Sequence, residues 1–296
     1  MRTYNIRHRT VYQYGSQASL CHNEVRLTPN NTGRQKRLQT NLSVTPHPAV
    51  QTTYEDFFGN QVVAFSIQEP HDNLEIELES HVEVEPPNWL ADSADTLSWE
   101  EVVALVRTNQ EDSVMQFTLP SPYITLTEGL RVYTATSFTK GRPLAEATKD
   151  LMQRIHNDFD FKAGFTDIST PLSELLEHRK GVCQDFAQLG IGCLRSIGLP
   201  AGYVSGYIET MPPEGEEKLV GADASHAWFS VFHPLLGWME YDPTNNMQPA
   251  GQHITVGYGR DFGDISPVKG IMVGSGSHEI EVSVDVVPEP LKGKGG

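Results

Sequence analysis

The change of hydrophobic pattern at Pro86-Pro87 constrains the fold of this chain more than any other feature. Before this point, apolar residues largely alternate with polar ones, as in residues 3–14, which is typical of half-buried strands. After it, apolar residues recur at helical spacing, and strand-like runs return only beyond residue 200. This order predicts an antiparallel, sandwich-like or barrel-like β domain in the N-terminal part, followed by helices and a second strand-rich part.

The strand-like runs are short, and turn-forming residues such as Phe58-Gly59-Asn60 separate them. Gly15-Ser16 is expected to end the first run. We divide the chain into a β-rich N-terminal domain (1–88), a helical connector (89–142) and a C-terminal domain (143–296). The predicted strands cover residues 3–14, 24–27, 38–44, 61–67, 74–84, 203–209, 227–233, 238–241, 254–258 and 280–287.

Helix-start signals mark the chain between the two strand-rich parts. Ser98 and Glu101 form a capping-box pattern, in which each side chain satisfies a free backbone N–H of the other residue. A second helix is expected to begin near Pro143. Thr170-Pro171 fits the N-cap and first position of a third, short helix.

Composition limits the compartment and the partners. The chain has 22 basic and 38 acidic residues, a net charge of −16, which argues against nucleic acid or an anionic membrane as the main partner. The first residues lack the apolar stretch of a signal peptide, and no apolar run approaches the ~18 residues of a membrane span. The three cysteines are too few for a disulfide framework. We therefore expect a cytoplasmic protein; no oligomeric state is indicated.

Cys183 lies at the start of a predicted helix that ends before Gly198-Leu199-Pro200. It shares one face with Ala187, Gly190, Ile191 and Leu194, so it could be a small packing residue. The alternative is a nucleophile, because the first turn of a helix favours a thiolate.

Cys193 lies mid-helix, ten residues beyond Cys183 and therefore roughly 15 Å along the axis. We interpret it as a packing residue, too distant to share a metal ion with Cys183. The chain has no CxxC or HxxxH pattern, so neither a metal nor another cofactor is expected.

Two residues downstream could complete a catalytic group with Cys183. His226 begins one predicted strand, and Asp242 ends the next, where Pro243 stops it. If these strands pair as antiparallel neighbours, the two side chains lie together at one sheet edge. A carboxylate in that place would fix the imidazole tautomer and stabilise its charged form. A cysteine nucleophile, a histidine base and an orienting carboxylate together form a triad.

The three segments around these residues, RKGVCQDFA, DASHAWFSVF and GWMEYDPTNN, resemble the motif blocks of the transglutaminase-like superfamily. YNIRHRTVYQY, HNEVRLTP, FFGNQV and GYGRDFGDISPVKG resemble the bacterial members that carry a β-rich N-terminal region. The resemblance covers nearly the whole chain. It implies an α+β protein, in which a sandwich-like β domain precedes a papain-like core as the catalytic domain. It also implies Cys183, His226 and Asp242 as catalytic residues. It also implies acyl chemistry on a protein or peptide amide, as in transglutaminases, proteases and amidases.

We therefore predict a thiol-dependent peptidase or amidase that acts through a Cys-His-Asp triad and a thioester. A cross-linking protein-glutamine gamma-glutamyltransferase and a non-catalytic binding or assembly module are the alternatives. The backbone N–H of Cys183 is the expected oxyanion donor, and Gln184 lies beside it. Trp228 and Asp261 could each wall the cleft or serve packing and structure. Asp223 is a weaker alternative to Asp242 and another possible wall residue.

Overall fold

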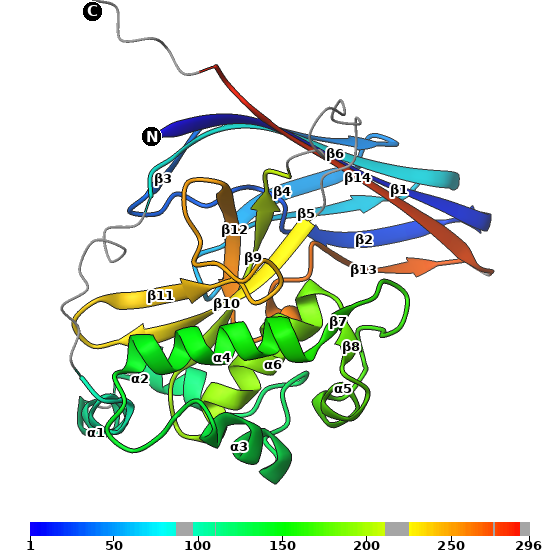
Figure 1. Cartoon of the computed structure of the whole chain (residues 1–296). Coiled ribbons are helices and arrows are strands. Elements are labelled where there is room, and N and C mark those ends of the chain that lie inside the picture. Colours follow the sequence, from blue (N-terminus) through cyan, green and yellow to red (C-terminus); the bar gives the residue numbers. More distant parts are fainter. Residues whose placement is uncertain (87–96, 110, 211–224, 275, 291–296) are drawn as a thin grey trace, which may run out of the picture.

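The computed structural model describes residues 1–86, 97–109, 111–210, 225–274 and 276–290. Figure 1 shows three regions: a β sandwich, a smaller sheet beneath it, and helices that cover the far face of that smaller sheet. The predicted α+β class and the N-terminal β domain are confirmed. Among the described residues, none of the helices is both long and apolar enough to cross a membrane.

Two four-stranded antiparallel sheets form the sandwich. In strand order, the first contains β14 (His278–Pro288), β1 (Arg2–Ala18), β6 (His71–Val84) and β3 (Gln35–Thr45). The second contains β13 (Val268–Val273), β2 (Leu20–Val25), β5 (Gln61–Ile67) and β4 (Val50–Glu55). Alternating side chains of β1 and β6, such as Tyr4, Ile6, Ile76 and Leu78, are buried between the sheets.

The sandwich differs from the sequence-based expectation in three ways. Strand β1 continues through Gly15 to Ala18, because Gly15 N–H donates to the carbonyl of Ser277 at 2.8 Å. Strands β4 and β13 carry mostly exposed side chains, so their pattern gave no strand signal. Strands β13 and β14 pair with β2 and β1, although the sequence-based division groups residues 268–288 with the C-terminal domain. The domain limits themselves stay a prediction.

The smaller sheet is antiparallel and has the order β11-β10-β9-β12. Its members are β9 (Ala201–Ile208), β10 (Ser225–His233), β11 (Gly237–Tyr241) and β12 (His253–Gly259). The short strands β7 (Asp160–Phe161) and β8 (Lys180–Gly181) pair in parallel, just before the helix that begins at Cys183.

The helices form the other layer: α1 (Trp99–Asn109), α2 (Asp112–Met115), α3 (Glu128–Ala135), α4 (Leu144–Asp158), α5 (Leu172–His178) and α6 (Cys183–Ser196). Two 3-10 turns, η2 (Gln116–Thr118) and η3 (Phe262–Asp264), complete the set of described helical elements.

Capping residues, prolines and glycines in the sequence predicted most of the observed helix ends. The capping box before α1 is present, with Ser98 N–H donating to Glu101 Oε2 at 2.8 Å. Helix α4 follows Pro143 as expected, and Gly198 after α6 has a φ of +86°, which suits glycine. Helix α5 begins one residue later than expected: Pro171 is the N-cap. The Thr170 hydroxyl instead accepts from Asp167 N–H at 3.0 Å, so it does not cap the helix.

Helix α6 is the central helix of the molecule and packs against β10 and β9. Its residues from Asp185 to Arg195 are all buried. Gly190 allows the close approach, because a Cβ at this position would lie 2.5 Å from the ring of Phe229 on β10. This contact fixes how deep the helix sits on the sheet and hence where its N-terminal turn lies.

Replacing Gly190 with alanine is therefore expected to lower the melting temperature. The methyl group must displace Phe229, and overpacking of this kind costs about 1–3 kcal/mol, against about 1 kcal/mol gained from helix propensity. Gly33→Ala is the matched control, because a Cβ there meets no atom within 4 Å. Equal melting temperatures for the two variants would show that the close approach is not needed.

Candidate active site

Cys183 occupies the first turn of α6, where backbone N–H groups have no partner within the helix. The turn is held by Asp185, whose Oδ2 accepts from Val182 N–H at 2.8 Å and from the Thr166 hydroxyl at 2.6 Å. Cys183 is partly exposed, whereas Cys21 and Cys193 are buried. Burial raises the pKa of the Cys193 thiol to about 12. Cys183 is thus the cysteine that a reagent or substrate can reach.

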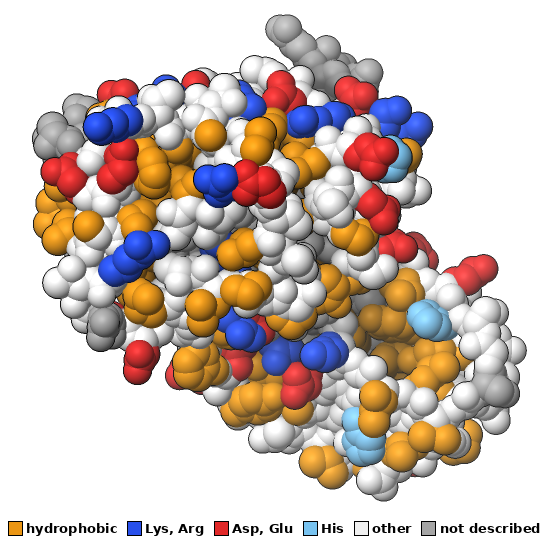
Figure 2. All heavy atoms as spheres, turned by 90° about the horizontal axis from the view of Figure 1, so that it is seen from below, with side chains coloured by type: hydrophobic (Ala, Val, Ile, Leu, Met, Phe, Trp, Pro, Cys, Tyr) orange, Lys and Arg blue, Asp and Glu red, His pale blue; other side chains and the backbone are white. Residues whose placement is uncertain are grey.

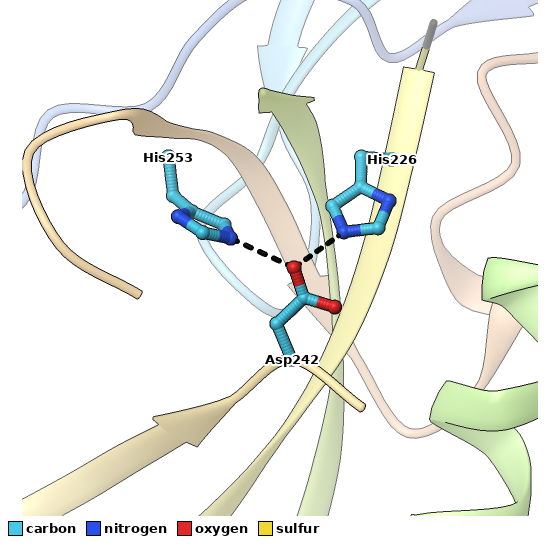
Figure 3. Close-up of side chains that lie close together, drawn as sticks. All are labelled: His226, Asp242 and His253. Atoms are coloured by element: carbon cyan, nitrogen blue, oxygen red, sulfur yellow. Dashed lines mark hydrogen bonds and ion pairs between the residues drawn. The ribbon is translucent and has the colours of Figure 1, made fainter. Parts of the chain in front are cut away.

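His226 and Asp242 meet because β10 and β11 are antiparallel neighbours, as predicted. His226 Nε2 lies 2.7 Å from Asp242 Oδ2 (Figure 3), and both side chains are almost fully buried. Cys183 lies close enough to His226 to raise the pKa of the imidazole. Since Asp242 takes Nε2, the nitrogen that remains for Cys183 is Nδ1. The structure therefore joins the three residues that the sequence analysis singled out.

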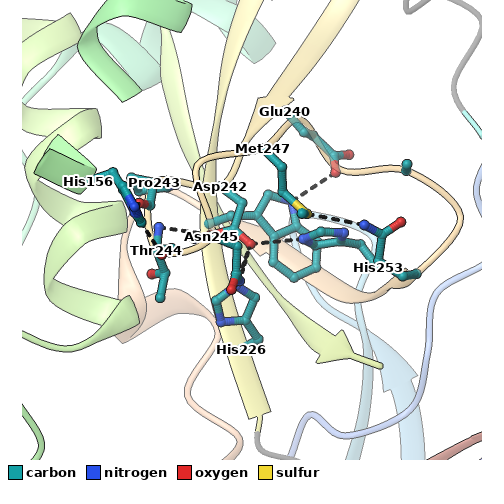
Figure 4. A network of polar contacts seen from close by, with 12 residues as sticks. His156, His226, Glu240, Asp242, Pro243, Thr244, Asn245, Met247 and His253 are labelled. Atoms are coloured by element: carbon teal, nitrogen blue, oxygen red, sulfur yellow. Dashed lines mark hydrogen bonds and ion pairs between the residues drawn. The ribbon is translucent and has the colours of Figure 1, made fainter. Parts of the chain in front are cut away.

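The turn after β11 aims the carboxylate of Asp242. Its Oδ1 accepts from the backbone N–H groups of Thr244 and Asn245 at 3.0 and 3.2 Å, an Asx-type turn. The Asn245 side-chain amide donates to Oδ2 at 2.7 Å. On the other side of this turn, His156 of α4 lies within hydrogen-bond distance of the carbonyl groups of Pro243 and Thr244 (Figure 4). The carboxylate is thus fixed before any substrate binds.

The surroundings of the pair favour its charged form. Burial opposes protonation of His226, but the interactions with Asp242 and with Cys183 outweigh it and raise the pKa of His226 to about 10. Burial likewise opposes ionisation of Asp242, yet hydrogen bonds from His226 and His253 hold the pKa of its carboxyl well below the usual value. An imidazolium facing a cysteine attracts negative charge on the sulfur, and the thiolate is the nucleophilic form.

His253 is a member of this group that the sequence analysis missed. It is fully buried on β12, and its Nε2 lies 3.0 Å from the same Asp242 oxygen. Its only sequence signal is its place, directly before a predicted strand that pairs with the strand after α6. Strand order decides that this histidine reaches Asp242, and one sequence does not reveal strand order.

His226, Asp242 and His253 place potential metal-ligand atoms within 4.8 Å of one another. Both Nε2 atoms lie within hydrogen-bond distance of Oδ2. A metal ion would need each Nε2 as a bare lone pair and would break both hydrogen bonds. The arrangement fits a hydrogen-bonded carboxylate better than a metal ligand set.

Trp228 supports both histidines from within the fold. Its ring centroid lies 5.8 Å from that of His226 and 5.1 Å from that of His253. Its indole N–H donates to Glu240 Oε2 at 2.8 Å, and Arg34, between β2 and β3, donates to the same oxygen at 2.7 Å. Trp228 is fully buried, so it lies beneath the histidines.

The other candidate residues from the sequence analysis are Gln184, Asp261 and Asp223. Gln184 follows Cys183 in the first turn of α6. Asp261 is fully buried, caps η3 and accepts from Tyr123 N–H at 2.9 Å, a structural arrangement. Arg260 and Asp264 form an ion pair beside it at 2.9 Å. Asp223 lies outside the described residues.

A cavity of about 810 Å³ lies between the sandwich, α2, η2 and the smaller sheet. Arg34, Phe58, Phe117, Trp238, Glu240 and Tyr258 are among its lining residues. Cys183 and His226 do not line it. Glu240 connects the cavity to the histidine pair through Trp228.

Seen from the helical side, the surface shows acidic and basic side chains side by side and hydrophobic side chains gathered around a hollow (Figure 2). The segment before Cys183 contributes exposed apolar residues: Phe161, Phe165 and Ile168 are 59%, 42% and 48% exposed. Phe161 pairs with Gly181, two residues before Cys183. An apolar substrate group could contact this segment.

Two family models match the chain. The bacterial transglutaminase-like N-terminal region matches residues 4–83, and the transglutaminase-like superfamily matches residues 133–243. The second match contains Cys183, His226 and Asp242. An uncharacterized protein of Mycobacterium tuberculosis is 41% identical to the chain, over 96% of this chain and 92% of that protein. A segment covering 25% of the chain is 36% identical to 11% of a protein-glutamine gamma-glutamyltransferase of Pseudomonas aeruginosa.

Among solved structures, a candidate cysteine protease from Cytophaga hutchinsonii matches 98% of this chain and 92% of its own, with a TM-score of 0.78 and 20% sequence identity. At this identity the likeness shows the fold alone. The family, by contrast, is shown by the two family-model matches and by the relative from Mycobacterium tuberculosis. The chain belongs to the transglutaminase-like superfamily and carries the bacterial transglutaminase-like N-terminal region.

Proposed function

We propose that the protein is a thiol-dependent amide hydrolase or acyl transferase, with Cys183 as nucleophile, His226 as acid and base, and Asp242 as the orienting carboxylate. The observation that carries this proposal is the buried His226–Asp242 pair at 2.7 Å, with a partly exposed cysteine close to its imidazole. Burying a charged pair is costly unless its members are paired and hydrogen-bonded, and strongly shifted pKa values of this kind are typical of functional sites.

In the proposed mechanism, the Cys183 sulfur attacks the carbonyl carbon of an amide and forms a tetrahedral intermediate. His226 Nδ1 then gives its proton to the leaving amine, and the C–N bond breaks to leave a thioester. Water or a primary amine attacks the thioester, His226 takes the proton from the attacking group, and the thiolate leaves. The backbone N–H groups of Cys183 and Gln184, at the start of α6, are the proposed oxyanion donors.

We infer a protein or peptide substrate with an accessible amide, in a peptidase or amidase reaction. Exposed Phe161 and Phe165, in the segment that precedes Cys183, suit an apolar side chain of such a substrate. Transfer to an amine is the second candidate, favoured by the sequence similarity to the Pseudomonas aeruginosa glutamyltransferase. The two outcomes share every step as far as the thioester.

Mass spectrometry distinguishes the outcomes. The protein is incubated with a blocked Gln-Gly peptide and with unfolded casein, each with and without methylamine. Deamidated peptide or cut casein is expected, and a methylamide product would show transfer instead. Cys183→Ala serves as the control for contaminating activity. Unchanged substrates under all conditions would contradict the proposal for these amide classes.

A further inference from the structure

Asp242 Oδ2 has three hydrogen-bond partners, and the proposed mechanism uses only one of them, His226. His226 Nε2 lies at 2.7 Å, Asn245 Nδ2 at 2.7 Å and His253 Nε2 at 3.0 Å. His226 lies on β10 and His253 on β12, the two strands that flank β9, and Figure 3 shows both rings directed at the carboxylate. One carboxylate thus faces two imidazoles but carries a single negative charge.

The surroundings of the two rings differ. Burial lowers the pKa of His253, against the opposing effect of Asp242, whereas the pKa of His226 is raised. His253 Nδ1 is buried and has no hydrogen-bond partner among the described residues. A proton on Nδ1 would therefore be unsatisfied, and the hydrogen bond to Asp242 requires the proton on Nε2. His253 is consequently a neutral Nε2–H donor.

The ring of His253 is held in place from the other side. Trp228 contacts it nearly edge-on, with ring centroids 5.1 Å apart and an angle of 81° between the planes. The indole is fixed by Glu240, and Glu240 by Arg34, which precedes β3 of the sandwich. The charged or titratable groups around His253 are thus Asp242, His226 and Glu240, with Arg34 behind Glu240.

We propose that His253 is a positioning residue: its neutral Nε2–H donates to Asp242, which directs the carboxylate at His226 and leaves the single imidazolium there. The proposal rests on the proposed function of Cys183 and His226. The N-terminal sandwich takes part through Arg34, because Arg34 fixes the Glu240–Trp228 pair on which His253 packs. A substrate does not need to contact His253, which is fully buried.

The activity test compares His253→Leu with His253→Gln on the blocked Gln-Gly peptide. The leucine variant loses the donor, so kcat is expected to fall about tenfold to a hundredfold, the range known for groups that orient ligating histidines, with KM nearly unchanged. Glutamine keeps an amide N–H of similar reach and should restore most of kcat.

His233→Leu is the matched control. His233 is also fully buried, and its Nδ1 accepts from the N–H groups of Leu235 and Leu236 in the turn after β10. Its removal should lower the melting temperature and leave kcat in place. Wild-type kcat in a folded His253→Leu variant, or an equal loss in both leucine variants, would overturn the positioning role.

A second measurement does not depend on turnover. In the full chain with ¹⁵N-labelled histidine at neutral pH, NMR should show a charged His226 and a neutral His253 protonated at Nε2, assigned with the leucine variant. A charged His253, or a proton on its Nδ1, would refute this proposal even if Cys183 is catalytic. Conversely, this pattern in a protein without amide turnover would contradict only the proposed function.

Discussion

Cys183→Ala is expected to abolish amide turnover while the protein stays folded. Without the sulfur no thioester forms, and loss of a triad nucleophile lowers kcat on the order of a millionfold in other enzymes. The side chain is partly exposed, so its truncation leaves little cavity and the melting temperature should change little. The measurement is kcat on the blocked Gln-Gly peptide beside a thermal melt.

Cys193→Ala is the matched control for this prediction. Cys193 is fully buried in the middle of α6, so its truncation should lower the melting temperature and leave kcat in place. Iodoacetamide should label Cys183 in the folded protein, while buried Cys21 and Cys193 are protected. Full activity in folded Cys183→Ala would exclude the thiol mechanism. A labelling pattern that favours Cys193 would contradict the arrangement of α6.

Asp242→Asn is expected to lower kcat by roughly 10⁴-fold, the loss seen when the carboxylate of another triad becomes an amide. The amide has no negative charge to support the His226 imidazolium. Its NH₂ group accepts no hydrogen bond, so in the place of Oδ2 it would face the N–H donors of His226 and His253 or force a ring to turn. The effect should appear in kcat rather than in KM, because Asp242 is fully buried and does not contact substrate.

The same variant has a pH signature in its stability. The pKa of His226 in the folded protein is about 10, above the ordinary value of 6.5. Stabilisation from its protonation is therefore fully present below about pH 6.5 and is lost as the pH rises toward 10. The difference in melting temperature between wild type and Asp242→Asn should accordingly shrink over that range.

Asp150→Asn provides the control for charge removal at a distance from the site. Asp150 is a partly exposed residue of α4 that pairs with Arg142 at 3.5 Å. Its replacement should change neither kcat nor this pH dependence. An Asp242→Asn variant with wild-type kcat, or a melting difference that grows with pH, would show that the His226–Asp242 pair is not charged as described.

The sequence was most informative where the signal is local. The start and stop of α6, the capping box at Ser98 and the order of Cys183, His226 and Asp242 depend on nearby residues and on motifs. Pairing of the two strands that carry His226 and Asp242 also followed, because a short connection between successive strands favours antiparallel neighbours.

Long-range pairing was the main source of missed features. Strand β13 has an exposed, irregular pattern, and it forms only because β2 offers a free edge. Strand β1 passes Gly15 because residues near Ser277 return to pair with it, more than 250 positions later. In both cases, no sequence pattern indicates which distant segment a strand pairs with.

The sequence by itself thus determined the fold class, the helix that presents Cys183, and the candidate triad residues. Only the tertiary structure decided that β12 brings His253 to Asp242, and that Arg34 of the sandwich reaches Glu240 beneath Trp228. The physical reason is that the periodicity of hydrophobic residues and the preferences of turn residues depend on stretches of only a few residues. The environment of a buried carboxylate instead depends on which distant strands become neighbours, and that is settled by packing of the whole chain.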